Sequence, residues 1–128
     1  MPSFRNIIFE YAKEIYGTAP EYPWESAPDY AVLRHGNGKW YCVIMDIHPS
    51  KVGLSGDGKI DVMNVKCDPF LIGTFLSRKG YFPPYHMCKS SNWITVSLDG
   101  KVDIEQVKFM LDMSYEIINK TNKFKRLP

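Results

Sequence analysis

Three strand-like runs between residues 30 and 66 limit the possible folds more than any other feature of the chain. The runs 30–35, 39–47 and 60–66 are rich in β-branched and aromatic residues, which are enriched in strands. A Gly-Asn-Gly sequence at 36–38 joins the first two runs, and Asn-Gly is a strong signal for a tight hairpin. A polar turn over 48–59 joins the second and third. Successive strands joined by hairpin loops favour a mainly antiparallel sheet.

Helical segments precede and follow these strands. Residues 4–16, 68–79 and 103–119 each place apolar residues on one helical stripe, which predicts amphipathic helices. Asp68 suits the N-cap position of the second helix. A fourth strand is predicted over 93–98. The predicted order is therefore α-β-β-β-α-β-α, and the predicted fold class is α+β with the helices packed on one face of the sheet.

A proline-rich loop lies between the first helix and the first strand. Residues 18–29 contain three prolines, which remove amide donors and disfavour helix. Tyr22 and Trp24 lie among them, and aromatic residues in such loops usually anchor the loop to the core. No linker or repeat divides the sequence, so residues 1–128 are predicted to form a single domain, which we expect to be a monomer.

The charge of the chain is unevenly distributed. The net charge is +2, which by itself does not indicate a polyanion partner. Residues 1–64 hold six Lys/Arg and eight Asp/Glu, a balance of −2, and residues 65–128 hold ten and six, a balance of +4. The surplus of basic residues in the second half fits either a solvated surface or a footprint for nucleic acid.

The cysteines predict a reducing compartment. Cys42, Cys67 and Cys88 form an odd set with no C-x-x-C pair, which favours free thiols and a cytoplasmic protein. No apolar run approaches the ~20 residues of a membrane span, so we expect no membrane association.

Cys67, His86 and Cys88 are the side chains most suited to metal or nucleophilic chemistry. They could supply three zinc ligands, but a structural zinc site normally needs four. A Cys–His nucleophile pair would need a lowered thiol pKa and an orienting group, and the sequence indicates neither. The glycine-rich turn at 53–58 lacks the following helix that phosphate binding requires. No metal and no other cofactor is therefore predicted.

Several short motifs follow one another in a characteristic order and spacing over nearly the whole chain. They are Tyr30-Ala31-Val32-Leu33-Arg34-His35, Lys39-Trp40-Tyr41, Val65-Lys66-Cys67-Asp68-Pro69, Tyr85-His86-Met87-Cys88-Lys89, Trp93-Ile94-Thr95-Val96 with Leu98-Asp99-Gly100, and Asp112-Met113-Ser114-Tyr115. In this arrangement the chain resembles the MmcQ/YjbR family of small proteins. The resemblance implies a fold related to the frataxin-like α/β sandwich, with paired hairpin loops in a double-wing DNA-binding arrangement. The chain departs from the family pattern at Cys88, where the family has Asn, and in the longer interval between Lys89 and Trp93, which lacks a His before the Trp.

Three functional hypotheses follow. The first is a non-enzymatic protein that binds the backbone of double-stranded DNA, using basic residues of the two hairpin loops and their surroundings: Arg34, Lys39, Lys51, Lys59, Lys66 and Lys89. The second is a binding module for a small molecule or protein, with a pocket between the sheet and residues 81–92 lined by Tyr85, His86 and Trp93; the alternative for Trp93 is a place in a core strand. The third is an enzyme in which His86 is the acid–base group.

Overall fold

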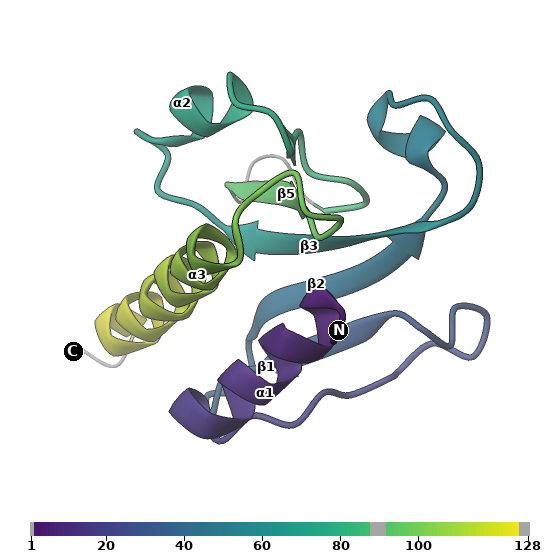
Figure 1. The fold of residues 1–128 in the computed structure, drawn as a ribbon. Helices are drawn as coiled ribbons and strands as arrows, with labels where there is room; N and C mark the ends of the chain where they lie inside the picture. Colours follow the sequence, from purple (N-terminus) through teal and green to yellow (C-terminus); the bar gives the residue numbers. More distant parts are fainter. Residues whose placement is uncertain (1, 88–91, 126–128) are drawn as a thin grey trace.

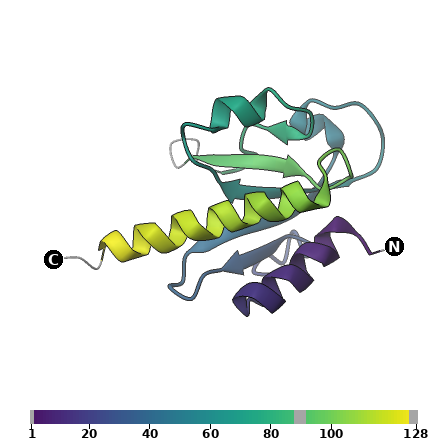
Figure 2. The same cartoon turned by 60° about the vertical axis from the view of Figure 1, so that its left-hand side comes forward.

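The computed structural model describes residues 2–87 and 92–125, with side chains described as far as residue 120, and within them it has an α+β architecture (Figure 1). Its elements in chain order are α1 (Phe4–Tyr16), β1 (Ala31–Arg34), β2 (Trp40–Ile47), the 3-10 helix η1 (Pro49–Val52), β3 (Ile60–Lys66), α2 (Ile72–Leu76), β4 (Tyr81–Phe82), β5 (Trp93–Ser97) and α3 (Ile104–Lys125). The strands form one sheet in the order β1-β2-β3-β5-β4, and all four described strand pairs are antiparallel. Helices α1 and α3 lie on one face of this sheet (Figure 2). The predicted fold class is confirmed.

Helix α1 has the predicted bounds. The Ser3 side chain accepts a hydrogen bond from the Asn6 amide, and Gly17 ends the helix with φ 66°, a conformation that glycine adopts without steric penalty. Ile8 is fully buried, but Ile15 is 56% exposed. The predicted stripe therefore holds only for the first part of the helix.

The second predicted helix is wrong in its extent. Only Ile72–Leu76 is α-helical, and the Asp68 carboxylate accepts a hydrogen bond from the Phe70 amide in the turn before it. Asp68 is therefore not the N-cap of the helix. The segment contains Gly73, a poor helix former, and Phe75 is its only buried residue, so packing does little to extend the helix.

The sequence also missed two short elements and misplaced one end. Neither η1 nor the two-residue strand β4 was predicted, because two to four residues give too few positions for a periodic pattern. Helix α3 extends to Lys125, beyond the expected end near Asn119.

A bulge in β2 decides which side chains face the helices. Leu33 pairs with Cys42, but Arg34 pairs with Trp40, so Tyr41 is an extra residue in the ladder. Tyr41 and Cys42 both belong to the core beneath the helices, whereas Trp40 packs on the opposite face. The strict alternation of a regular strand would place Trp40 and Cys42 on the same face.

Two tyrosines of α1 join this helix to α3. The hydroxyl of Tyr11 donates to the Asp112 carboxylate at 2.7 Å, and the hydroxyl of Tyr16 donates to it at 2.5 Å. The Tyr16 ring also stacks on Tyr115, with ring centroids 3.7 Å apart. Burial, followed by the hydrogen bond to Asp112, raises the pKa of Tyr11 to about 12 and raises the pKa of Tyr16 further.

These raised pKa values predict a loss of stability at high pH. In the unfolded chain a tyrosine loses its proton near pH 10, but Tyr11 and Tyr16 must keep theirs to donate to Asp112. Their contribution is therefore complete below about pH 10 and is lost as pH rises toward and beyond 12. An absorbance titration at 295 nm alongside circular dichroism measures this, and we expect part of the phenol signal to titrate only with unfolding. Asp112→Asn should lower the pKa of both phenols. Titration of all eight tyrosines near pH 10 in a folded protein would contradict the account.

Candidate ligand-binding site

The sheet face opposite α1 and α3, called the second face below, carries its own apolar cluster. Its buried members are Val32, Val43, Met45, Ile47 and Val62. Loops and the short helix η1 cover this face in place of α1 and α3. Their partly buried side chains pack on the cluster and include Trp24, Tyr30, Val52, Tyr85 and Met87. Binding residues occur disproportionately on loops that a rigid scaffold positions, so this face is where a site is expected.

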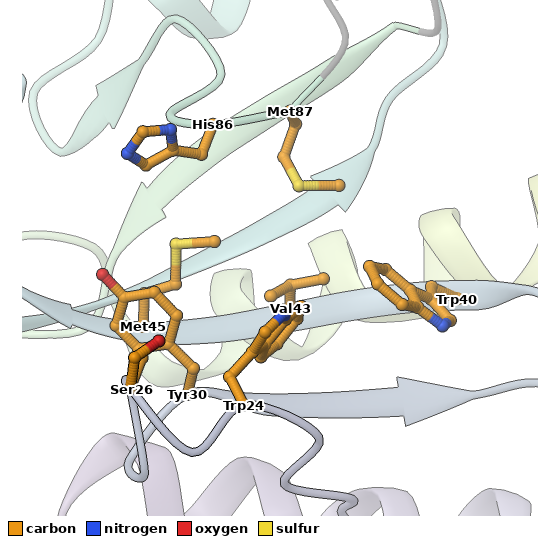
Figure 3. Close-up of a pocket in the computed structure, with 9 residues that line it drawn as sticks. Trp24, Ser26, Tyr30, Trp40, Val43, Met45, His86 and Met87 are labelled. Carbon is orange, nitrogen blue, oxygen red and sulfur yellow. The ribbon is translucent and has the colours of Figure 1, made fainter.

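A pocket of about 310 Å³ opens on the second face (Figure 3). The residues that line it are mostly aromatic or apolar: Trp24, Ser26, Ala27, Tyr30, Trp40, Val43, Met45, His86 and Met87. The Trp24 ring meets Trp40 at 5.6 Å and 86°, and meets Tyr30 at 6.1 Å and 79°. These edge-to-face contacts fix the three rings relative to one another.

The side chains approach the pocket from two sides. His86 and Met87 lie above it in Figure 3, and Trp24, Tyr30 and Met45 lie below it. We call the segment 84–87 the roof. Val43 and Met45 of β2, together with the loop aromatics, form the floor.

Two fully buried polar side chains tie the roof to the sheet. Asn64 of β3 and Thr95 of β5 are paired across the ladder on the second face, and both are inaccessible to solvent. The Thr95 hydroxyl donates to the Asn64 Oδ1 at 2.6 Å and accepts a hydrogen bond from the Tyr85 amide at 2.9 Å. The Asn64 Nδ2 donates to the Val43 carbonyl at 3.3 Å. The chain of hydrogen bonds therefore runs from the roof to the floor.

The structure places the three predicted pocket residues differently from one another. His86 lines the pocket, is exposed and has a positive φ of 58°. Tyr85 packs on the second-face cluster, with its ring 4.2 Å from that of His86. Trp93 is only 8% exposed in β5 and lies under the Lys66 ammonium, 5.4 Å from the ring centroid. A pocket does lie between the sheet and the predicted segment, but Trp93 belongs to the strand.

Sequence reasoning missed most of the floor. Trp24 had a signal, an aromatic residue in a proline-rich loop, but that pattern does not distinguish a core anchor from a pocket wall. Trp40 had none, because the bulge that turns it to the second face cannot be seen in the alternation of the strand. From the sequence, Met45 is indistinguishable from an ordinary core residue, because methionine commonly fills gaps in apolar cores.

The candidate basic residues fall at two ends of the sheet. Arg34 and Lys39 flank the β1–β2 turn, and Lys66 ends β3 at the same end. Lys51 and Lys59 belong to the β2–β3 loop at the other end of β2 (Figure 2). A strand of this length spans roughly 25 Å, so the two groups are well separated. Lys89 lies outside the described residues.

Some of these cations are already paired within the chain. The Arg34 guanidinium lies 3.0 Å from the Glu21 carboxylate, and the Lys59 ammonium lies 3.5 Å from that of Asp46. Such exposed pairs contribute little to stability, but they reduce the positive charge that a polyanion would meet.

The described thiols are unsuited to metal or nucleophilic chemistry. Cys42 and Cys67 are both buried, and burial raises the pKa of Cys67 to about 11 and that of Cys42 further, so both are protonated at neutral pH. Cys88 lies outside the described residues. Within the part of the chain that the structure describes, no three His, Cys, Asp or Glu side chains are grouped as a metal site would require.

The helices that the structure describes include none with the length and apolar character needed to cross a membrane.

The fold and the pocket together define a small α+β protein with one helix-covered and one loop-covered sheet face. A family model described as YjbR matches residues 13–117, which is most of the 128-residue chain. The chain belongs to the YjbR family, and the resemblance found in the sequence is confirmed.

Individual relatives agree with this assignment. The chain is 40% identical over 114 residues to the uncharacterized protein YyaQ of Bacillus subtilis, covering 88% of this chain and 96% of that protein. A crystal structure of a Pseudomonas syringae protein matches with a TM-score of 0.84 and 40% identity, covering 88% of this chain and 97% of that one. The crystal structure of Deinococcus radiodurans DR2400 matches with a TM-score of 0.72 at 20% identity, covering 94% and 81%, and supports the fold alone.

Proposed function

We propose that this protein is a binding module that takes a small, largely apolar ligand in the pocket of the second face. The observation that carries the proposal is the pocket itself, which gathers Trp24, Tyr30 and Trp40 around an opening in a sheet face covered by loops. Its volume of about 310 Å³ lies at the lower end of the range for small-molecule sites. An apolar lining with a few polar groups at its edge is typical of such sites.

Titration with N-phenyl-1-naphthylamine, an uncharged dye that fluoresces in apolar surroundings, tests this proposal. We expect a saturable rise in fluorescence with one dye bound per chain. Trp24→Ala should weaken binding by about tenfold, because it removes a ring that contributes on the order of 1.5 kcal/mol of contact.

Tyr22→Ala is the matched control for Trp24→Ala. Tyr22 lies two residues away in the same loop, is 52% exposed and does not line the pocket, so its removal should leave dye binding unchanged. The proposal fails if the folded protein does not bind the dye, or if both variants weaken binding equally.

Duplex DNA is the second candidate partner, because one end of the sheet gathers basic residues from distant parts of the chain. Lys39 and Lys66 lie at the end that carries the β1–β2 turn. The rings of His35 and Tyr115 lie 4.6 Å apart and bring α3 to the same turn, and the exposed Lys120 follows on this helix. DNA ranks second because the other predicted loop lies at the far end of β2, so the two loops do not form one surface.

The salt dependence of DNA binding tests this candidate. Each phosphate contact adds about 0.9 to the slope of log K against log salt. Lys39→Ala with Lys120→Ala should therefore weaken binding and reduce that slope by up to about 2. The matched pair Lys51→Ala with Lys59→Ala removes the same charge from the far end and should change the slope much less. Fluorescence anisotropy with a labelled duplex measures both, and an absence of binding at low salt would exclude DNA.

A further inference from the structure

The pocket of the proposed binding module is a slot of fixed height. The roof is held to the sheet by the Tyr85 amide, which donates a hydrogen bond to the Thr95 hydroxyl. The floor includes Val43, whose carbonyl accepts a hydrogen bond from the Asn64 side chain. The Thr95–Asn64 hydrogen bond of 2.6 Å joins the two sides. Burying two polar side chains in an apolar sheet face is unfavourable unless they are hydrogen-bonded, and here both are. A short connection, fully buried at Asn64 and Thr95, therefore joins the roof to the floor and sets their separation.

The groups that face the slot suit a flat ring. Trp24 and Tyr30 present aromatic surfaces, and Met45 below and Met87 above present thioether groups (Figure 3). Aromatic rings and thioethers both make favourable contacts with a further aromatic ring. A puckered apolar ring of similar size would gain free energy from the burial of its apolar surface, but it would not make these ring and thioether contacts.

The lining also selects against charge. Among the described residues that line the pocket none is an aspartate, glutamate, lysine or arginine, and burial is the main cause that raises the pKa of Tyr30 and keeps its phenol neutral. An ion would lose its hydration on entry, and the charges nearest to Tyr30, those of Asp46 and Lys59, are paired with each other. The polar groups of Ser26, Tyr30 and His86 lie toward one side of the view in Figure 3, with Trp40 toward the other. One edge of the ligand is therefore offered the hydroxyl and imidazole groups, and the rest meets mainly ring and thioether surfaces.

We infer that the ligand of this pocket is an uncharged, planar aromatic or heteroaromatic group with one hydrogen-bonding edge, held in a slot whose height Asn64 and Thr95 set. This inference rests on the proposed function. Asn64 and Thr95 act as positioning residues, because neither lines the pocket.

Calorimetric titration with four matched compounds tests the ligand class. Indole is planar and uncharged with one N–H donor, tryptamine adds a cation, indole-3-acetate adds an anion, and cyclooctanol is a puckered apolar ring of similar size. We expect indole to bind about tenfold more tightly than each of the others, as two added ring contacts or one unpaired charge would require.

Each of the other possible results of this titration would overturn a particular part of the inference. Tighter binding of tryptamine indicates a cation site formed by the aromatic faces, and equal binding of cyclooctanol removes the requirement for a flat ring. If all four fail while N-phenyl-1-naphthylamine binds, the binding module stands, but a planar ring with one N–H donor is not sufficient for binding and the inferred ligand class is wrong. If the dye fails as well, both are wrong.

Variants at Thr95 test the positioning role. Thr95→Val keeps the shape of the side chain and removes the hydroxyl that joins the Tyr85 amide to Asn64, so the preference for indole over cyclooctanol should fall toward onefold. Thr95→Ser keeps the hydroxyl and should restore the preference. A ratio of affinities does not change with the folded fraction, so general destabilisation would leave it unaltered. A preference unchanged in Thr95→Val would show that the roof is held by other contacts.

Discussion

Replacing Ser114 with alanine is expected to lower the free energy of unfolding by about 3 kcal/mol. The Ser114 side chain is fully buried on α3 and bonds to two strands at once. Its hydroxyl donates to the Tyr41 carbonyl at 2.5 Å and accepts from the Lys66 amide at 2.9 Å. The variant leaves both of these groups without this partner, and each buried unsatisfied group costs about 1–3 kcal/mol. The contact with Tyr41 lies at the bulge in β2, so this serine also supports the strand that turns Trp40 toward the pocket.

Urea denaturation of Ser114→Ala measures this loss. Ser77→Ala is the matched control, because the Ser77 hydroxyl also bonds to a carbonyl, that of Thr74, but at an exposed position. It should change stability by less than about 0.5 kcal/mol. A loss below about 1 kcal/mol for Ser114→Ala would mean that the two strands find other partners for these groups.

Gly80→Ala is expected to destabilise the protein by about 3 kcal/mol, for two separable reasons. Gly80 has φ 92°, which is unfavourable for any residue with a Cβ. A Cβ there would also lie 2.5 Å from the Val102 Cγ2, too close for van der Waals contact, and such overpacking costs about 1–3 kcal/mol. The Gly80 carbonyl accepts from the Ser97 amide, so a shift to relieve the clash would disturb the sheet beside β4.

Two further variants separate the reasons. Gly58 has φ 79° and open space around its Cβ position, so Gly58→Ala should show the backbone cost alone, about 1 kcal/mol. Adding Val102→Ala to Gly80→Ala removes the clashing methyl group and should make the double variant more stable than the sum of the two single effects predicts. If the effects of the two substitutions on the free energy of unfolding simply add, the clash in Gly80→Ala is relieved without cost.

The sequence predicted the parts of the fold whose pattern is local. The strand at 60–66 and the helix at 4–16 have their predicted bounds, because alternation, helical periodicity and caps act over a few neighbouring residues. The second helix is shorter than its pattern predicts because only part of its apolar stripe is buried: Phe75 packs in the core, but Leu71 and Leu76 are 38% and 37% exposed. Packing of that kind depends on tertiary structure that the stripe does not encode.

The candidate site was harder to predict for two different reasons. The side chains of Trp40 and Cys42 point to opposite faces of the sheet because of the bulge in β2. The bulge depends on the register between β1 and β2, which the sequence of one strand does not reveal. The basic residues of the two loops are a different case, because consecutive turns of an antiparallel meander always lie at opposite ends of the shared strand. The predicted strand order already implied that Lys39 and Lys51 would be far apart, and the DNA hypothesis grouped them nevertheless.

The most direct test of the central claim, that the second face holds the binding site, uses the methyl groups of the methionines. Met45 and Met87 line the pocket, whereas Met63 and Met110 are buried in the core beneath the helices. In methyl NMR spectra of protein titrated with N-phenyl-1-naphthylamine, we expect ring-current shifts of Met45 and Met87 that saturate together, with Met63 and Met110 unmoved. Shifts confined to the helix-covered core, or no saturable shift at Met45 and Met87, would contradict the account.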